Sequence, residues 1–389
     1  MESQQENAAD RTEVPETTRG LTRELVQQHL SVLGKNPYSQ AFVYTTATLS
    51  ELELTDLNAI TEFPHIQHVV CAHNALESLV PIGDLRLLLS VDASHNQLTQ
   101  VLDFDIPQCM PDHAWAQGGE WIGSLLRRAN LSYNQIPRIR DLSTAHPFLQ
   151  ELYLAHNDIG EIRGIASLRF LRVLDLSHNR LRSTHGLLPP GCLEALLGSS
   201  TYEIEAMPPR LEALEILRLS HNQITNIDEV VGLPRLVELE LAHNKLKQLA
   251  SLEHCYRLQH LDLAFNALED VNELNYLIQL SFLQHLTLQG CPIAEQTDSK
   301  VFYRARVLRR LQQLVQLDED EISAKEKVKA LAMHGSELAS RQQVLTKHLP
   351  SERFVNYLPP LEFDDDAALY AFYEQRFGPS EGVDERPVV

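Results

Sequence analysis

The feature that most constrains the fold is an asparagine that returns about every 22 residues. The gaps between successive copies are 22, 38, 23, 22, 43, 22 and 22 residues, so two gaps exceed the period by 16 and 21 residues. A fixed period of this length predicts stacked coils that pack only on their neighbours, with insertions at the two long gaps. The eight asparagines are Asn74, Asn96, Asn134, Asn157, Asn179, Asn222, Asn244 and Asn266.

Apolar residues surround each asparagine in the pattern L-x-x-L-x-L-x-x-N-x-L. The L-x-L pair predicts a short strand with both leucines on one face. The asparagine has one acceptor and two donors, so it can bridge backbone groups where the chain turns out of the strand. We therefore expect parallel strands about 4.8 Å apart and a ladder of asparagines. One clean copy runs Leu171, Leu174, Leu176, Asn179 and Leu181.

This pattern is identified as that of a leucine-rich repeat protein. The resemblance implies an α/β fold: a solenoid with a curved parallel sheet on its concave side and irregular or 3-10 backbone on its convex side. Each coil buries its leucines against its neighbours, so we expect helical caps at the two open ends.

The N-terminal edge departs from the repeat pattern. Residues 1–18 are polar and acidic, which predicts a disordered tail. Residues 19–48 are expected to form a helical cap, with Thr22 as its N-cap and Gly34 as the stop of a helix. The stretch "LSELELTDLNAI" then resembles a weak first coil with Leu57 in the asparagine position.

The rest of the chain divides into three parts. The repeats and their C-terminal cap are expected over 49–320, with insertions near 103–124 and 186–209. A helical extension is expected over 321–378, and a disordered tail over 379–389. Inserted loops on a rigid array often carry partner contacts, although plain surface decoration remains an equal alternative.

The C-terminal edge predicts a cap. In the last coil Cys291 replaces the asparagine, and Ser323 with Glu326 forms a capping box that begins a helix. An apolar series before that helix is expected to seal the last coil: Phe302, Val307, Leu308, Leu311, Leu314 and Leu317.

Charge and cysteine content exclude several functions. The chain has 33 Lys and Arg against 53 Asp and Glu, a formal net charge of -20. Binding to nucleic acid needs clustered cations, so we expect none; the charge suits basic partners. Five scattered cysteines without a C-x-x-C motif predict a reduced, cytoplasmic chain. No apolar run approaches about 18 residues, so no membrane span is expected.

A histidine precedes the asparagine in six repeats, and Tyr133 and Phe265 take that place in two others. Zinc needs about four ligands around one centre at about 2.0–2.3 Å, whereas a column spaced by about 4.8 Å provides no such centre. We therefore expect a structural column at the rim of the concave face, with no metal and no cofactor. Acid would charge its members together, which predicts a pH-sensitive fold. The six are His73, His95, His156, His178, His221 and His243.

The concave face is the candidate binding site. The residue between the last two leucines of each repeat, and the residue two positions earlier, point out of the sheet. An acidic surface there would suit a basic helix or an arginine-rich segment, while a merely solvated sheet face remains the alternative. The candidate partner-binding residues are Glu151, Tyr153, Asp175, Arg218, Glu238, Glu240 and Asp262.

The sequence offers no catalytic constellation. The phosphate-loop pattern G-x-x-x-x-G-K-[ST] and the nucleophile pattern G-x-S-x-G are both absent. We therefore expect a protein that is not an enzyme.

Two stretches narrow the resemblance. The period resembles the SDS-type repeats of phosphatase regulators and axonemal proteins. The stretch "LTRELVQQHLSVLGKNPYSQAFVYTTATLSELELTDLNAITEFPHIQHV" resembles the opening of the ciliary radial-spoke leucine-rich repeat proteins. The stretch "VLRRLQQLVQLDEDEISAKEKVKALAMHGSELASRQQVLTKHLPSERFVNYLPPLE" is similar to the leucine-rich repeat and guanylate kinase domain-containing proteins. These resemblances cover roughly residues 20–362.

The resemblance implies a protein-binding scaffold or adaptor in the axoneme of cilia or flagella, such as a radial-spoke component. No kinase activity carries over, because the nucleotide loop is absent. The alternative with the same fold is a regulatory subunit that binds a protein phosphatase through its concave face.

Overall fold

The computed structural model describes residues 19–36, 40–104, 124–143, 145–198, 210–295 and 300–334. Both predicted tails lie outside the described residues, as do most of the first insertion, the end of the second and the extension beyond residue 334.

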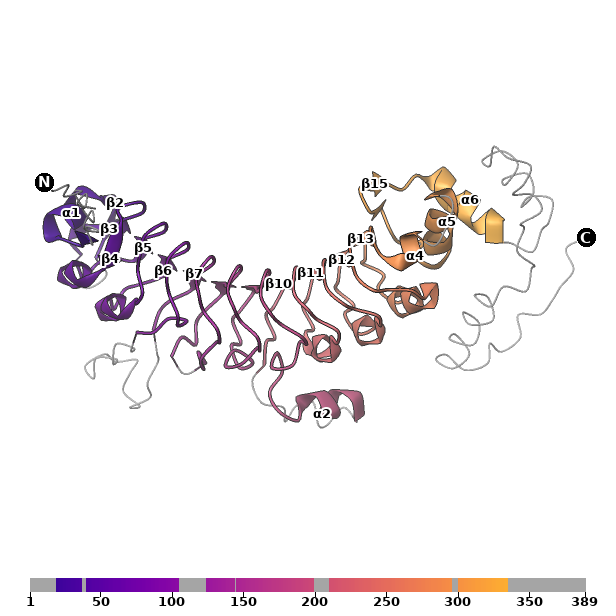
Figure 1. Cartoon of the computed structure of the whole chain (residues 1–389), viewed down its shortest axis with the longest axis horizontal. Coiled ribbons are helices and arrows are strands. Elements are labelled where there is room, and N and C mark those ends of the chain that lie inside the picture. The colour runs from indigo at the N-terminus through magenta and orange to yellow at the C-terminus, as the bar shows by residue number, and fades with distance from the viewer. Residues whose placement is uncertain are drawn as a thin grey trace, which may run out of the picture.

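Thirteen of the described strands form one long curved sheet (Figure 1). Its order is β15-β14-β13-β12-β11-β10-β9-β8-β7-β6-β5-β3-β2, and β5 to β14 run parallel. Equivalent residues pair directly, as Leu217 does with Leu174 and Leu239. The repeat strands are β5 (His68–Val70), β6 (Ser90–Asp92), β7 (Arg128–Asn130), β8 (Glu151–Tyr153), β9 (Val173–Asp175), β10 (Ile216–Arg218), β11 (Glu238–Glu240), β12 (His260–Asp262) and β13 (His285–Thr287).

Short 3-10 helices return the chain along the convex side. Only a few residues are left for this side in a 22-residue coil, so single tight turns replace longer α-helices. The leucines of both sides meet in one continuous core; Leu174 and Leu176 have no exposed surface. Burying one such side chain stabilises the fold by about 1.5–3 kcal/mol. The helices are η1 (Asn58–Glu62), η2 (Val80–Asp84), η4 (Asp228–Gly232), η5 (Ala250–Leu252) and η6 (Val271–Leu277).

The asparagines tie neighbouring coils together. The Asn179 amide nitrogen donates to the carbonyls of Leu154, at 2.9 Å, and Leu176, at 3.0 Å. Its amide oxygen accepts from the Ile159 amide at 3.0 Å. Bonds of the same kind recur at the other seven asparagines. Each asparagine thus satisfies backbone groups of two consecutive coils.

The N-terminal cap contains less helix than the sequence predicted. Helix α1 (Arg23–Gln28) begins as expected, with the Thr22 hydroxyl accepting from the Leu25 amide at 3.3 Å. The helix prediction was wrong beyond Gln28. Strand β2 (Leu30–Lys35) follows and pairs with β3 (Phe42–Thr48) as an antiparallel hairpin.

Gly34 lies inside this hairpin and does not end a helix. A Cβ at Gly34 would lie 2.7 Å from the methyl carbon of Thr45, so the close packing of the two strands requires glycine. The pairing energy of β2 with β3 outweighs the helical spacing of Leu30 and Leu33.

The first coil also differs in register. Ala47 pairs with Val69, which places Glu51 and Leu52 in the His-Asn positions instead of Leu57. Leu52 has no side-chain amide to serve as a ladder asparagine, but its backbone N–H donates to the Asn74 amide oxygen at 3.1 Å. The predicted place of Leu57 was therefore wrong. The short strand β4 (Leu54–Asp56) pairs outside the main sheet with β1 (Arg19–Gly20).

The C-terminal cap closes the array. Helices α4 (Pro292–Glu295) and α5 (Lys300–Arg310) precede β14 (Gln316–Leu317), β15 (Asp320–Glu321) and α6 (Ala324–His334). Of the predicted sealing residues, five are fully buried and Phe302 is partly buried against the core: Val307, Leu308, Leu311, Leu314 and Leu317 are the buried ones.

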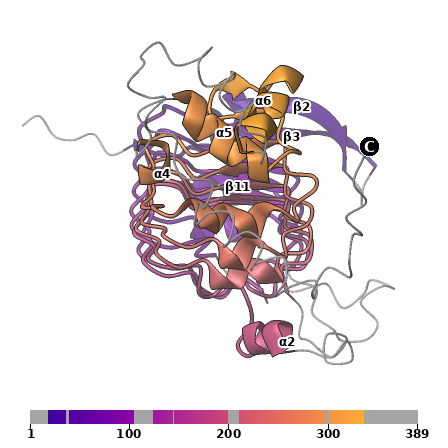
Figure 2. The same cartoon turned by 90° about the vertical axis from the view of Figure 1, so that its right-hand side faces the viewer.

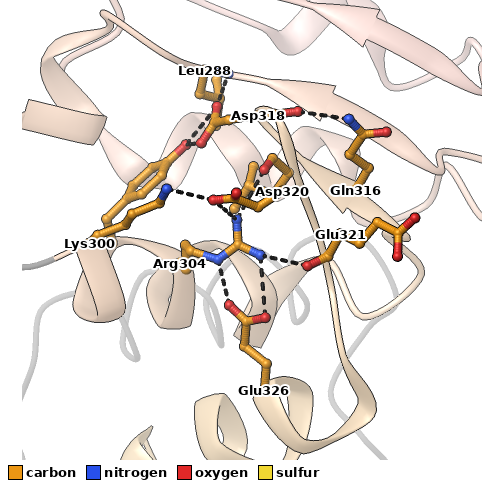
Figure 3. Close-up of polar contacts among 10 residues, drawn as sticks. Leu288, Lys300, Arg304, Gln316, Asp318, Asp320, Glu321 and Glu326 are labelled. Atoms are coloured by element: carbon orange, nitrogen blue, oxygen red, sulfur yellow. Dashed lines mark hydrogen bonds and ion pairs between the residues drawn. The ribbon is translucent and has the colours of Figure 1, made fainter. Parts of the chain in front are cut away.

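Polar contacts hold this cap together (Figure 3). The guanidinium of Arg304, which is 5% exposed, bonds Glu326 at 2.5 Å and donates to the Leu317 carbonyl at 3.0 Å. The Asp318 carboxylate accepts from the Leu288 amide at 2.8 Å. In the other coils the equivalent amide donates to a backbone carbonyl of the next strand, as Leu263 does to Thr287, so the Asp318 side chain takes the place of that carbonyl after β13. The Glu326 amide donates to the Ser323 hydroxyl at 3.2 Å, so Ser323 caps α6.

Candidate functional site on the concave face

The seven candidate residues lie on the concave face of five adjacent strands. Their neighbours in each strand, such as Leu152 and Leu239, are buried, while the candidates are half-buried and face outward. Because the strands pair in register, they form two columns down the face. The columns contain Glu151, Tyr153, Asp175, Arg218, Glu238, Glu240 and Asp262.

Arg218 neutralises part of the acidic surface. Its guanidinium contacts Glu238 at 2.6 Å and Glu240 at 3.0 Å. Burial works against the charge of Arg218, but the bonds to Glu240 and Glu238 outweigh it and raise the pKa of Arg218. Burial also raises the pKa of Glu240, in spite of the bond to Arg218. These two glutamates are therefore engaged within the protein.

A second cluster lies on β7 and β8. Arg128 contacts Glu151 at 3.4 Å, and its guanidinium carbon lies 5.4 Å from the centroid of the Tyr153 ring. The Tyr153 hydroxyl donates to Glu151 at 3.1 Å. Burial and the Glu151 charge raise the pKa of Tyr153. Sequence reasoning left Arg128 out of the site, although its register directly beside Glu151 could have revealed the pair.

The two aspartates have a local structural role. Asp175 accepts from the Ser177 amide at 2.9 Å, and Asp262 accepts from the Ala264 amide at 3.0 Å. Asp92 does the same for the Ser94 amide, at 3.1 Å. Within the described ranges, no lysine or arginine forms an ion pair with Asp175 or Asp262. Their charges are the ones left open to a partner.

Eight aromatic rings stack along the strand-exit rim of this face, and we call them the ring column. Adjacent ring centroids are 3.8–4.3 Å apart and the planes differ by 11–14°. The separations are shorter than the usual strand spacing of about 4.8 Å, because the concave side of a curved array is the shorter side. The column consists of His73, His95, Tyr133, His156, His178, His221, His243 and Phe265.

Every member of the ring column has a left-handed backbone, with φ between 53° and 58°. Gly290 takes the same place in the next coil with φ of 70°, and a Cβ there would lie 2.4 Å from the Phe265 ring. The column therefore ends because Gly290 leaves room for the last ring. The repeat pattern did not indicate this conformation, which is uncommon for residues other than glycine and asparagine.

Two hollows join the ring column to the concave strands. One of about 580 Å³ is lined by His221, His243 and Phe265 on the rim and by Glu240 and Asp262 on the floor. Another of about 450 Å³ is lined by rim residues and by Arg128, Tyr153 and Asp175. The rim and the floor thus form one continuous surface.

Four histidines of the ring column favour the uncharged form more than a free histidine does. Burial lowers the pKa of His95, His156, His178 and His221. The charges of neighbouring histidines lower it further, while Asp175 acts against this at His156 and His178. In the described part of the chain, no group of three or more His, Cys, Asp or Glu side chains is placed to hold a metal ion.

Two family models match the chain. A leucine-rich repeat model matches residues 193–347, and a model of two leucine-rich repeat copies matches residues 147–188. Together with the stacked parallel coils, these matches identify the fold. The chain is a leucine-rich repeat solenoid. The solved structure of the leucine-rich repeat domain of APL1B is similar to this chain over 70% of this chain and 67% of that one, with a TM-score of 0.47 and 21% identity.

Curated relatives match the solenoid over part of its length. Leucine-rich repeat-containing protein 23 from Bos taurus and from Homo sapiens is 26% identical over 244 residues. The match covers 56% of this chain and 66% of the relative, so the chain spans just under two thirds of those proteins. The alpha subunit of geranylgeranyl transferase type-2 from Rattus norvegicus is 37% identical over 91 residues, or 23% of this chain. Among the described residues, no helix is long and apolar enough to cross a membrane.

Proposed function

We propose that this solenoid is a non-catalytic scaffold that binds a partner protein along its concave face. The observation that carries the proposal is the continuous surface of rim and floor, on which no lysine or arginine among the described residues pairs with Asp175 or Asp262. The repeats support it, since stacked coils present an extended concave binding surface. The aromatic rings, carboxylates and shallow hollows of this surface are groups that can contact a partner protein.

The partner that this surface suits is a basic segment. Between β9 and β12 the outward columns carry Asp175, Glu238, Glu240 and Asp262 against Arg218 alone. Complementary charge speeds encounter and fixes register more than it adds raw affinity. A helix or an extended strand rich in arginine would satisfy the carboxylates of this region.

We propose that the protein functions in the axoneme of cilia or flagella. The N-terminal segment resembles radial-spoke leucine-rich repeat proteins, and the C-terminal segment resembles leucine-rich repeat and guanylate kinase domain-containing proteins. The match to leucine-rich repeat-containing protein 23 adds to this support. The relatives reported above give no support to the alternative of a phosphatase-regulating subunit.

Two experiments test this proposal. In flagellated cells, the tagged chain should remain with detergent-extracted microtubules; release with the soluble fraction would contradict an axonemal role.

A double variant, Asp175→Asn with Asp262→Asn, tests the binding surface. It removes two charges, while an amide oxygen can still accept from the Ser177 and Ala264 amides. We expect about a threefold to tenfold weaker partner binding, equivalent to about 1 kcal/mol.

Asp92→Asn is the matched control. Asp92 makes the same local bond to Ser94 but lies outside the acidic stretch. Equal binding by the double variant and the wild-type chain would contradict a basic partner on these strands.

A further inference from the structure

The hairpin of β2 and β3 exposes an apolar surface. Leu33 is 60% exposed, Phe42 67% and Tyr44 50%. Leu33 pairs with Tyr44, and Lys35 with Phe42, so all four side chains lie on one face of the hairpin. The Lys35 ammonium lies 5.6 Å from the centroid of the Phe42 ring. We call this the hairpin patch.

The hairpin patch continues the concave face. On β3 the buried residues are Thr45 and Ala47, and Tyr44 and Thr46 alternate with them on the opposite side. Thr46 pairs with His68, the first residue of the outward column. Phe42 and Tyr44 therefore belong to the same sheet face as that column. Figure 2 shows the hairpin extending past the coils in the direction of the strands.

The free edge of the hairpin is blunted against strand addition. Val32 has φ of 57°, a conformation that β-branched residues rarely adopt, and its carbonyl accepts from the Thr45 hydroxyl at 3.0 Å. An irregular edge strand that also carries a lysine is a poor template for another strand. Side-chain contact, rather than backbone pairing, is thus what the hairpin patch offers.

We infer that the concave face binds a bipartite segment of a partner protein, with apolar residues on the hairpin patch and basic residues on the acidic strands. This inference rests on the proposed function and specifies its partner. Five to eight strand steps separate β3 from the strands that carry Asp175 and Asp262, or about 24–38 Å. The two parts of the segment are therefore about 16–25 residues apart in a helix.

Other occupants of the hairpin patch fit less well. Residues 1–18 of this chain are acidic and offer Met1 and Val14 as their only apolar side chains larger than alanine or proline. A second copy would bring the same Lys35 against Lys35 at a two-fold contact, with no acidic group on the patch. The acidic strands on the same face favour a partner that carries basic residues.

Synthetic helical peptides test the inference by fluorescence anisotropy with the full chain. One peptide carries a Leu-Phe pair and three arginines about 20 residues apart on one face. A second has the same residues about eight apart, and a third has the arginines alone. We expect the long-spaced peptide to bind about tenfold more tightly than the other two. The double variant Leu33→Ser with Phe42→Ser should abolish that advantage and leave the arginine-only peptide unaffected.

Val80→Ser is the control variant, because Val80 is 56% exposed on the convex side. Equal affinity of the long-spaced and arginine-only peptides would overturn the inference. If, in that case, binding of the arginine-only peptide still depended on Asp175 and Asp262, the inference would fail but the proposed function would stand. Tighter binding after deletion of residues 1–18, or a dimer that dissociates in the serine variant, would also overturn it in favour of another occupant.

Discussion

Asn222→Ala should destabilise the solenoid by about 2–4 kcal/mol. The Asn222 amide oxygen accepts from the Leu181 amide at 2.9 Å, and no other acceptor of the ladder reaches that group. Its amide nitrogen donates at 3.0 Å to the carbonyls of Leu176 and Leu219. Those carbonyls keep one bond each, from Asn179 and Asn244.

The magnitude follows from this accounting. One buried N–H loses its only partner, which costs about 1–3 kcal/mol, and the weakened carbonyl bonds add about 1 kcal/mol. Gln223→Ala is the matched control, since the adjacent Gln223 is exposed, and it should change stability by less than about 0.5 kcal/mol.

Urea unfolding followed by circular dichroism measures the difference, and hydrogen exchange locates it. We expect the Leu181 amide to lose protection in Asn222→Ala and to keep it in Gln223→Ala. A stability within about 0.5 kcal/mol of the wild-type chain, with Leu181 still protected, would refute the reasoning that the asparagine supplies an irreplaceable acceptor.

Two further predictions concern pH and the C-terminal cap. The folded-state pKa is lowered for His95, His156, His178 and His221, so the unfolded chain binds more protons as the pH falls. The stability from these groups is present above their unfolded pKa of about 6.5 and is lost as the pH falls through the lowered folded values, so Tm should fall between pH 7.5 and 5. The test is a triple variant in which asparagine replaces His156, His178 and His221, because asparagine adopts the left-handed backbone and does not titrate. If Tm falls as much in this variant as in the wild-type chain, the histidines of the ring column do not cause the pH dependence. In the cap, Arg304→Ala leaves the carboxylate of Glu326 and the Leu317 carbonyl without their guanidinium bonds and should cost about 2–4 kcal/mol. Hydrogen exchange should then rise first in α6; unchanged exchange there would contradict the role of Arg304.

The repeat pattern predicted the solenoid because its two periods act independently. The alternation of residues around Leu174 sets which side chains are buried, and the 22-residue period sets which residues pair between strands. The outward columns were therefore readable from the sequence, including the position of Asp175 beside Arg218.

The features that the sequence could not show depend on contacts that the 22-residue repeat does not encode. Leu30 and Leu33 have helical spacing, yet their backbone pairs with β3, and this decides the N-terminal cap. The engagement of Glu238 and Glu240 by one arginine depends on rotamers that no pattern encodes. The left-handed turn at each histidine is set by the backbone bonds on both sides of it, such as that of His178 to the Ser220 carbonyl.

The asparagine ladder crosses both insertions without a change in geometry. The Leu98 amide donates to the Asn134 amide oxygen at 2.9 Å across 36 residues, and the Leu181 amide donates to the Asn222 amide oxygen at 2.9 Å across 41. The usual separation is 20 residues, at about the same distance, as for Ile159 and Asn179. The connections between coils can therefore vary in length without changing the hydrogen bonds of the asparagine ladder. A fluorescent reporter spliced into either long connection should therefore leave the asparagine ladder intact.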